Sequence, residues 1–97
     1  MVNNMRPIHP GEHLRDEMEE LGMSARALAK ALGVPVNRIT GILNEQRAVT
    51  ADTALRLSRY FGGTAEFWLN LQSAYELRST RQAAGKKIER VVTPRAA

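Results

Sequence analysis

The 97-residue sequence is long enough for one domain with a modest core and leaves little room for a separate catalytic domain. It contains no cysteine, which excludes disulfides and thiolate metal sites, and no apolar run approaches the roughly 18 residues that span a bilayer. The N-terminal residues lack the apolar core of a signal peptide, so we expect a cytoplasmic protein, with a formal net charge of +4.

The charges are unevenly distributed along the chain. Residues 12–20 contain five acidic residues and one arginine, whereas the remaining chain contains 13 Lys and Arg against five acidic residues. The basic excess favours an anionic partner. The acidic stretch is either the solvated outer face of a helix or a surface for a different partner.

A first helix is predicted to follow an extended lead-in over residues 1–8. Proline is favoured at the opening of a helix, so the helix should begin near Pro10, and it should stop at Gly22. Its inward stripe has the spacing i, i+4, i+7 and consists of Leu14, Met18 and Leu21.

The stretch from His9 to His13 matches H-x-x-E-H, a zinc-peptidase pattern. That chemistry needs both imidazoles on one helical face and a further ligand from elsewhere. Because Pro10 and Gly11 lie between the two histidines, where the helix only begins, we expect the histidines to cap and flank the helix instead. We therefore expect no metal site, no cofactor and no enzymatic activity.

Residues 24–44, SARALAKALGVPVNRITGILN, have the pattern of two short helices joined at a turn. Ser24 is a favoured N-cap, Gly33 can supply the positive φ that ends the first helix, and Pro35 suits the first turn of the second. The inward residues are Leu28, Ala29, Leu32, Val34, Ile39, Ile42 and Leu43. Such a pair forms a helix-turn-helix, whose second helix enters the DNA major groove. The alternative is an αα-hairpin inside a helical bundle, with no role in nucleic-acid binding.

The outer face of the second motif helix carries the candidate base-reading residues, which are Val36, Asn37, Thr40, Gly41 and Asn44. Asparagine can present a donor and an acceptor together to adenine, threonine can hydrogen-bond either base of a pair, and valine can contact a thymine methyl group. Gly41 costs about 1 kcal/mol of helix propensity relative to alanine. We interpret it as permitting close approach to DNA.

Four basic residues flank this surface and are candidates for phosphate contacts, namely Arg26, Lys30, Arg38 and Arg47. Phosphate contacts position a protein on DNA without reading its sequence. The alternative for each is an ordinary solvated surface charge.

Two further helices are predicted after the motif. Thr50 is an N-cap for the fourth helix, Asp52 favours its dipole, and Gly62 with Gly63 ends it. The inward stripe of this helix is Ala54, Leu57 and Phe61. Thr64 caps a fifth helix, whose broad apolar face comprises Phe67, Trp68, Leu71, Ala74 and Tyr75.

Leu69 and Leu77 lie off that face, on a second apolar strip. A helix that is apolar on two sides usually has two neighbours, so we predict a homodimer through the fifth helix. The alternative is that both are scattered surface leucines. Gly85 interrupts the helical pattern, which divides the chain into a DNA-binding and dimerisation domain over 1–84 and a basic tail over 85–97.

The opening MRPIHPGE, the motif at 24–44 and the stretch TADTALRLSRYFGGTAEFWLNLQSAYEL together resemble the HigA family of antitoxins, Xre-type helix-turn-helix repressors also labelled VapI or plasmid-maintenance antidote proteins. The resemblance covers residues 5 to 77 and is most specific over 50–72. It implies an all-α, compact five-helix, lambda-repressor-like domain with a short basic C-terminal tail. It also implies a dimer that binds a palindromic operator upstream of its own operon, with the DNA-reading helix at 36–44.

The resemblance further implies a toxin partner of the HigB type, a member of the RelE-like ribonuclease superfamily that cleaves mRNA at the ribosome. The antitoxin would block this toxin and repress its own transcription. Because RelE-like toxins are basic, the acidic first helix is the expected toxin-binding face. The chain departs from the family at Gly41, where relatives usually carry a polar or charged residue. Two other functions stay open: an Xre-type regulator without a toxin, and a helical interaction module that does not bind DNA.

Overall fold

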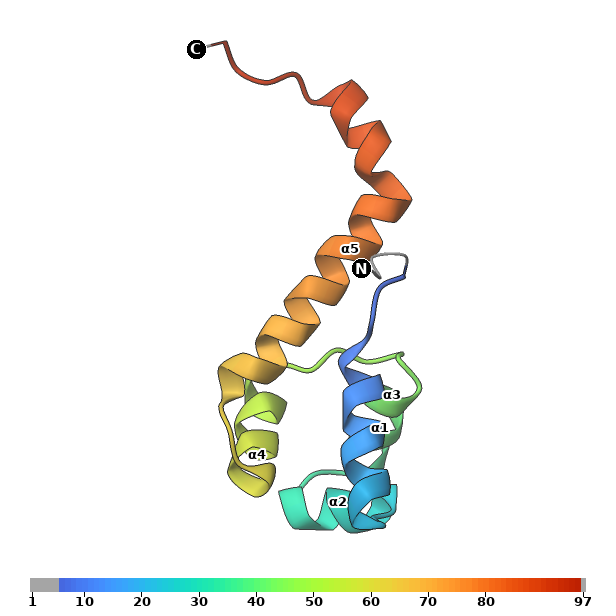
Figure 1. Ribbon diagram of the computed structural model, residues 1–97, viewed down its shortest axis with the longest axis vertical. Helices are drawn as coiled ribbons and strands as arrows, with labels where there is room; N and C mark the ends of the chain where they lie inside the picture. The colour runs from blue at the N-terminus through green and yellow to red at the C-terminus, as the bar shows by residue number, and fades with distance from the viewer. Residues whose placement is uncertain (1–5, 97) are drawn as a thin grey trace.

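The computed structural model describes residues 6–96, and within that range the fold consists of five α-helices (Figure 1). They are α1 (Pro10–Leu21), α2 (Ala25–Leu32), α3 (Val36–Leu43), α4 (Ala51–Phe61) and α5 (Ala65–Val91). The predicted all-α, five-helix architecture is therefore confirmed. Residues 1–5 of the predicted lead-in and Ala97 of the predicted tail lie outside the described residues.

The core is enclosed by the first four helices and the first half of α5. α2 packs on α3, α4 packs on α5, and α1 contacts both α3 and α5. Every helix contributes a buried apolar side chain, the most completely buried being Leu14, Leu28, Ile39, Ile42, Ala54, Leu57 and Trp68. Full burial of a large apolar side chain stabilises a fold by about 1.5–3 kcal/mol, so this cluster holds the motif helices in place.

α1 and α2 both end at a glycine in the left-handed conformation, Gly22 (φ 64°) and Gly33 (φ 71°). The residue after each glycine, Met23 or Val34, packs against the core, which is the arrangement of a Schellman cap. This geometry also explains why one prediction was wrong. Leu21 is 57% exposed, because Met23 on the far side of the turn covers that end of the core instead.

The predicted N-caps are confirmed for α2, α4 and α5, where the hydroxyl groups of Ser24, Thr50 and Thr64 accept hydrogen bonds from backbone N–H groups. α3 begins differently. Pro35 occupies its N-cap position and makes no side-chain hydrogen bond, so the helix proper begins at Val36.

α5 buries part of the predicted face. Trp68 is buried, Leu71 packs against the core and Tyr75 is half-buried, as predicted, whereas Ala74 is exposed. Trp68 and Gln72 are its buried residues, Leu69 packs partly against the core, and Phe67 is 42% exposed. The face is set by Gln72, whose Oε1 accepts the N–H of Val49 at 2.8 Å and so attaches the segment before α4 to α5. Leu69, predicted to lie in a dimer contact, is thus partly used by its own core.

α5 extends beyond the other four helices (Figure 1) and ends at Val91, so the helix break predicted at Gly85 is wrong. Glycine weakens a helix by about 1 kcal/mol without ending it, and the flanking alanines and lysines favour helix. Leu77 lies toward the extended part and is 58% exposed. None of the helices within residues 6–96 combines the length and the apolar character that crossing a membrane requires.

Candidate nucleic-acid interface

α3 divides sharply into a buried face and an outer face. Ile39 and Ile42 are fully buried, whereas Val36, Asn37 and Asn44 are exposed. The remaining two predicted base-reading residues, Thr40 and Gly41, are half-buried. The helix therefore offers a short row of small and polar side chains to the outside while its apolar side secures it in the core.

Contacts from α1 fix the carboxyl end of α3. The Arg15 guanidinium donates a hydrogen bond to the carbonyl oxygen of Leu43 at 3.2 Å, in the last turn of α3. Gly11, at the start of α1, lies directly against the backbone carbonyl of Ile42, where a Cβ atom would overlap the oxygen. Glycine at this position therefore allows α1 to cross close to the backbone of α3.

The backbone of Gly41 lies close to the segment that follows α3. Its carbonyl oxygen accepts hydrogen bonds from the N–H groups of Gln46 (2.9 Å) and Arg47 (3.1 Å), because the chain reverses at Glu45, which has a φ of 61°. A Cβ atom added at Gly41 would lie 3.2 Å from the Cβ of Arg47. The stem of the Arg47 side chain therefore packs closely against Gly41 within the chain itself.

Arg38 and Arg47 lie near each other at the start of α4. Together with Ala48, Thr50 and Thr53 they line a pocket of about 170 Å³. The amino end of a helix carries partial positive charge and free N–H groups, which favour a bound anion. Arg38 also forms an ion pair with Asp52: Nη1 of Arg38 donates to Oδ2 of Asp52 at 2.6 Å.

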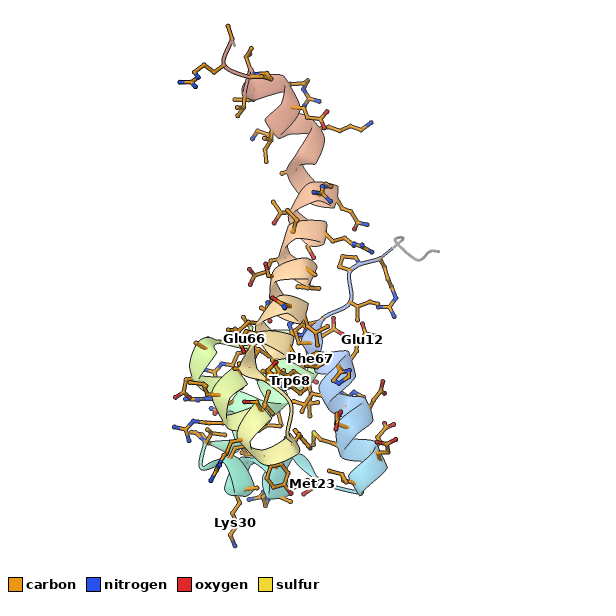
Figure 2. The ribbon with its side chains drawn as sticks, turned by 60° about the vertical axis from the view of Figure 1, so that its left-hand side comes forward. Glu12, Met23, Lys30, Glu66, Phe67 and Trp68 are labelled. Carbon is orange, nitrogen blue, oxygen red and sulfur yellow. The ribbon has the colours of Figure 1, made fainter. Side chains whose placement is uncertain are left out.

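The other two predicted phosphate contacts lie on α2, outside that pocket. Arg26 and Lys30 are one turn apart and both exposed. Lys30 projects from the end of the molecule opposite the extended part of α5 (Figure 2). The structure thus brings together two of the four predicted phosphate residues.

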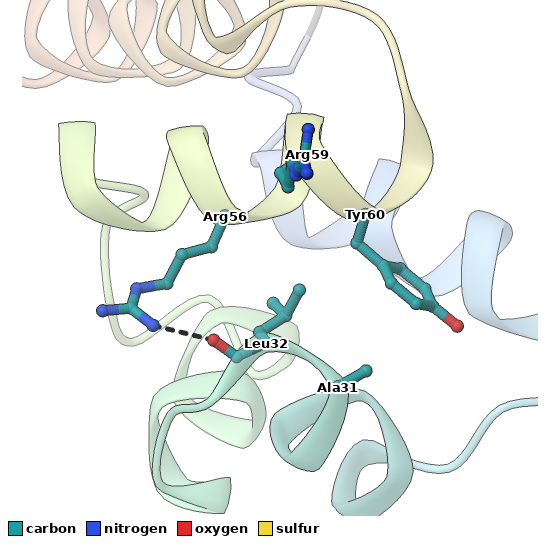
Figure 3. A pocket seen from close by; sticks show the side chains of 5 residues that line it. All are labelled: Ala31, Leu32, Arg56, Arg59 and Tyr60. Carbon is teal, nitrogen blue, oxygen red and sulfur yellow. Dashed lines mark hydrogen bonds between the residues drawn. The ribbon is translucent and has the colours of Figure 1, made fainter.

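Asp52 and Arg56 form a pair that supports the motif and was not predicted from the sequence. Arg56 donates from Nε to Asp52 at 2.9 Å and from Nη1 to the carbonyl oxygen of Leu32 at 2.8 Å, at the end of α2 (Figure 3). The hydrogen bonds that Asp52 accepts from Arg56 and from Arg38 lower the pKa of its carboxyl group. The i,i+4 spacing of Asp52 and Arg56 was a readable signal. Their connection to Leu32 and Arg38 depends on the fold.

α2 and α4 also line a second pocket. A pocket of about 340 Å³ lies between α2 and α4 and is lined by Ala31, Leu32, Arg56, Arg59 and Tyr60 (Figure 3). Arg56 forms one side of this pocket and reaches the motif turn from it.

His9 is the N-cap of α1, as predicted. It is 2% exposed, its Nδ1 accepts the N–H of Gly11 at 2.9 Å, and its ring packs edge-on against Tyr75 with centroids 4.7 Å apart. Burial lowers its pKa, against the raising effect of nearby carboxylates. His13 packs its ring against Trp68 at 5.3 Å. Within residues 6–96, no group of three or more potential ligands is placed to hold a metal ion.

The acidic residues of α1 form an outward strip. Asp16, Glu19 and Glu20 are exposed, whereas Glu17 lies 3.3 Å from His13 and Glu12 is paired with Arg6 at 2.7 Å. The exposed three therefore carry most of the negative charge available to a partner.

Comparison with known proteins identifies the relatives of the chain. A helix-turn-helix family model matches residues 14–68. Virulence-associated protein I of Dichelobacter nodosus is 59% identical over 81 residues, which span 82% of this chain and 75% of that protein.

Two solved structures match the fold closely. An addiction module antidote protein of the HigA family from Coxiella burnetii shares 59% identity with a TM-score of 0.90, covering 94% of this chain and 100% of that chain. Pseudomonas aeruginosa antitoxin HigA, solved with the higBA promoter, shares 50% identity with a TM-score of 0.90 over the same proportions.

Proposed function

The chain belongs to the HigA family of Xre-type helix-turn-helix antitoxins, and from that premise we propose that it binds its own operator through α3 and represses transcription of its operon. One observation carries the proposal. α3 buries Ile39 and Ile42 completely while Asn37 and Asn44 stand exposed on its outer side. An amphipathic helix of eight residues with an outer polar row is suited to the width of the major groove.

We assign direct base contacts to the side chains of Val36, Asn37, Thr40 and Asn44. The two asparagines would face adenine edges, and Val36 would face a thymine methyl group. Gly41 has no side chain and packs against the Arg47 side chain. The base contacts along this part of α3 would therefore come from neighbouring residues.

Phosphate contacts would flank this row. We propose that one phosphate binds at the pocket between Arg38 and Arg47, where the amino end of α4 adds its partial positive charge. Arg26 and Lys30 would contact phosphates farther along the duplex. Each phosphate contact should add about 0.9 to the magnitude of the salt slope of log affinity.

The operator-binding unit would be a homodimer. A palindrome is read by two copies related by a two-fold axis, with half-sites roughly 10–10.5 bp apart or a multiple of that distance. The extended part of α5 exposes Leu77 and is suited to this contact, while Leu69 would contribute less because it packs partly against its own core.

The second partner would be a HigB-type toxin of the RelE superfamily, which the protein would neutralise by binding. The exposed acids of α1, Asp16, Glu19 and Glu20, offer negative charge to a basic RNA-binding surface. This surface lies on a different helix from the proposed DNA-reading residues, so both partners have a place on one chain.

Gel retardation on the duplex upstream of the gene tests the DNA proposal. The wild-type protein should bind this duplex in a salt-dependent manner and more tightly than an unrelated duplex. Asn37→Ala should weaken operator binding by roughly tenfold or more, the value of a lost bidentate base contact. Asn70→Ala, an exposed asparagine on α5, is the matched control and should bind normally. Unchanged binding by Asn37→Ala and Thr40→Ala would contradict the assignment of α3.

A pull-down with the product of a small neighbouring reading frame tests the toxin proposal. Asp16→Lys with Glu20→Lys should abolish capture of a basic RelE-like protein, whereas Glu66→Lys on α5 should not. If both charge-reversal proteins retain the toxin, the acidic strip is not its binding face. If no such reading frame adjoins the gene, the regulator without a toxin becomes the better description.

A further inference from the structure

We infer that Asp52 is a positioning residue for operator binding, because its carboxylate joins Arg38 of the DNA-reading helix to Arg56 and, through Arg56, to the turn of the helix-turn-helix. The inference rests on the proposed DNA-binding role of α3. It concerns residues that make no base contact in that proposal.

A single carboxylate oxygen ties the two arginines together. Oδ2 of Asp52 accepts from Nη1 of Arg38 at 2.6 Å and from Nε of Arg56 at 2.9 Å. Arg38 projects from the first turn of α3, and its side chain is only 30% exposed. Without this carboxylate, two guanidinium groups would stand close together with no anion between them, and Arg38 would be free to take other rotamers.

Arg56 carries the connection onward to the motif turn. Its Nη1 donates to the carbonyl oxygen of Leu32 at 2.8 Å (Figure 3). It also donates to the carbonyl oxygen of Gly33 at 3.4 Å. These carbonyls end α2 and would otherwise lack a partner in the helix. A continuous series of charge-assisted hydrogen bonds thus runs from the end of α2, across α4, to the start of α3.

This series of hydrogen bonds matters for DNA binding because of where Arg38 lies. Arg38 lines the pocket that it shares with Arg47 at the start of α4, where we place a phosphate. An arginine already held in place loses less conformational freedom when it binds. Asp52 therefore favours the DNA-bound geometry, although its own charge repels DNA.

These two effects of Asp52 have opposite signs and can be separated. If the carboxylate only repels DNA, Asp52→Asn should tighten binding to every duplex alike. If it positions Arg38, Asp52→Asn should weaken binding to the operator, where register matters, and leave binding to unrelated DNA equal or tighter. The selectivity of the protein is therefore the informative quantity.

Affinities of wild type and Asp52→Asn for the operator and for an unrelated duplex of equal length, at three salt concentrations, provide the test. We expect a roughly two- to fivefold loss on the operator, the range of a partly exposed ion pair, without a loss on unrelated DNA. Glu66→Gln, at an exposed position on α5, removes the same single negative charge and should preserve the selectivity.

The same measurements in an Arg38→Ala background identify the route of the effect. There Asp52→Asn should cause no further loss on the operator, because the residue it positions is gone. An equal loss with and without Arg38, or equal tightening on both duplexes, would overturn the inference.

A further variant keeps the test usable if Asp52→Asn does not fold. If Asp52→Asn loses helical circular dichroism, Arg56→Lys replaces it, since lysine keeps the charge but cannot reach both Asp52 and Leu32 with a planar fork. It should reduce operator selectivity in the same direction, and unchanged selectivity would contradict the inference. Absence of operator selectivity in the wild type would instead refute the proposed function itself.

Discussion

Replacing Gly11 by alanine should destabilise the protein strongly, although the change adds one methyl group. Gly11 is buried at the point where α1 crosses α3, and its added Cβ atom would overlap the backbone carbonyl oxygen of Ile42. The same methyl group would lie 3.1 Å from Nδ1 of His9, the acceptor that caps α1. Neither neighbour is the mobile end of a flexible side chain, so the helices themselves must move.

The expected cost follows from two effects. Forcing an extra methyl group into a packed interior costs about 1–3 kcal/mol, and losing an N-cap costs about 1 kcal/mol more. A total of about 2–4 kcal/mol is a large share of the roughly 5–15 kcal/mol that stabilises a typical domain. For a chain of this size it should lower the Tm by roughly 10–30 °C.

Urea denaturation followed by circular dichroism measures this effect, with Gly85→Ala as the matched control. An added Cβ at Gly85 would meet the side chain of Arg81, Cγ at 3.4 Å and Cβ at 4.0 Å, which are ordinary contacts. Alanine should therefore stabilise the protein by up to about 1 kcal/mol. The two glycine substitutions should therefore have opposite signs. A free energy of unfolding for Gly11→Ala within about 0.5 kcal/mol of wild type would refute the reasoning, because effects that small are typical of unconstrained surface sites.

Three further predictions concern stability. Because burial lowers the pKa of His9 from its ordinary value of 6.5, the unfolded chain takes up the proton first, so the free energy of unfolding should fall as the pH drops below 6.5 and level off below the native pKa. Urea titrations at several pH values measure this decrease, which His9→Asn, a neutral cap, should remove. Glu45→Gly should stabilise the protein by up to about 1 kcal/mol in urea titrations, because it relieves a φ of 61°. Gln72→Leu should cost about 1–3 kcal/mol in thermal unfolding, because it leaves the N–H of Val49 buried without its acceptor.

Each of these has a clear contrary result. An identical pH dependence in wild type and His9→Asn would show that another group causes it. Destabilisation by Glu45→Gly would mean that the Glu45 side chain contributes more than its backbone conformation costs. A Gln72→Leu protein as stable as wild type would show that Val49 finds another acceptor, such as water.

The features that were predictable from the sequence depend on local rules. Ser24, Thr50 and Thr64 act as caps, and Gly33 ends α2, because hydroxyl groups and glycine satisfy helix ends wherever they occur. The buried face of α3 followed from the spacing of its two isoleucines. The helix-turn-helix could thus be located without coordinates.

The features that were missed depend on contacts between distant parts of the chain. The burial of Gln72 was not predicted, because its amide accepts from Val49, which is 23 residues away in the chain. The contact of Gly41 with Arg47 was not predicted, because Arg47 folds back over Gly41 only after the chain turns at Glu45. Asp52 was read as a helix-dipole residue, and its contact with Arg38 could be found only from the fold.

The central claim is that the outer side of α3 lies in the groove of operator DNA. Backbone amide chemical shifts of the ¹⁵N-labelled protein, recorded with and without the operator duplex, test it most directly. We predict that the largest changes fall at residues 36–44 and at Arg47, and that they are much smaller with an unrelated duplex at the same salt. Changes concentrated on α1 or along α5, with residues 36–44 unaffected, would contradict it.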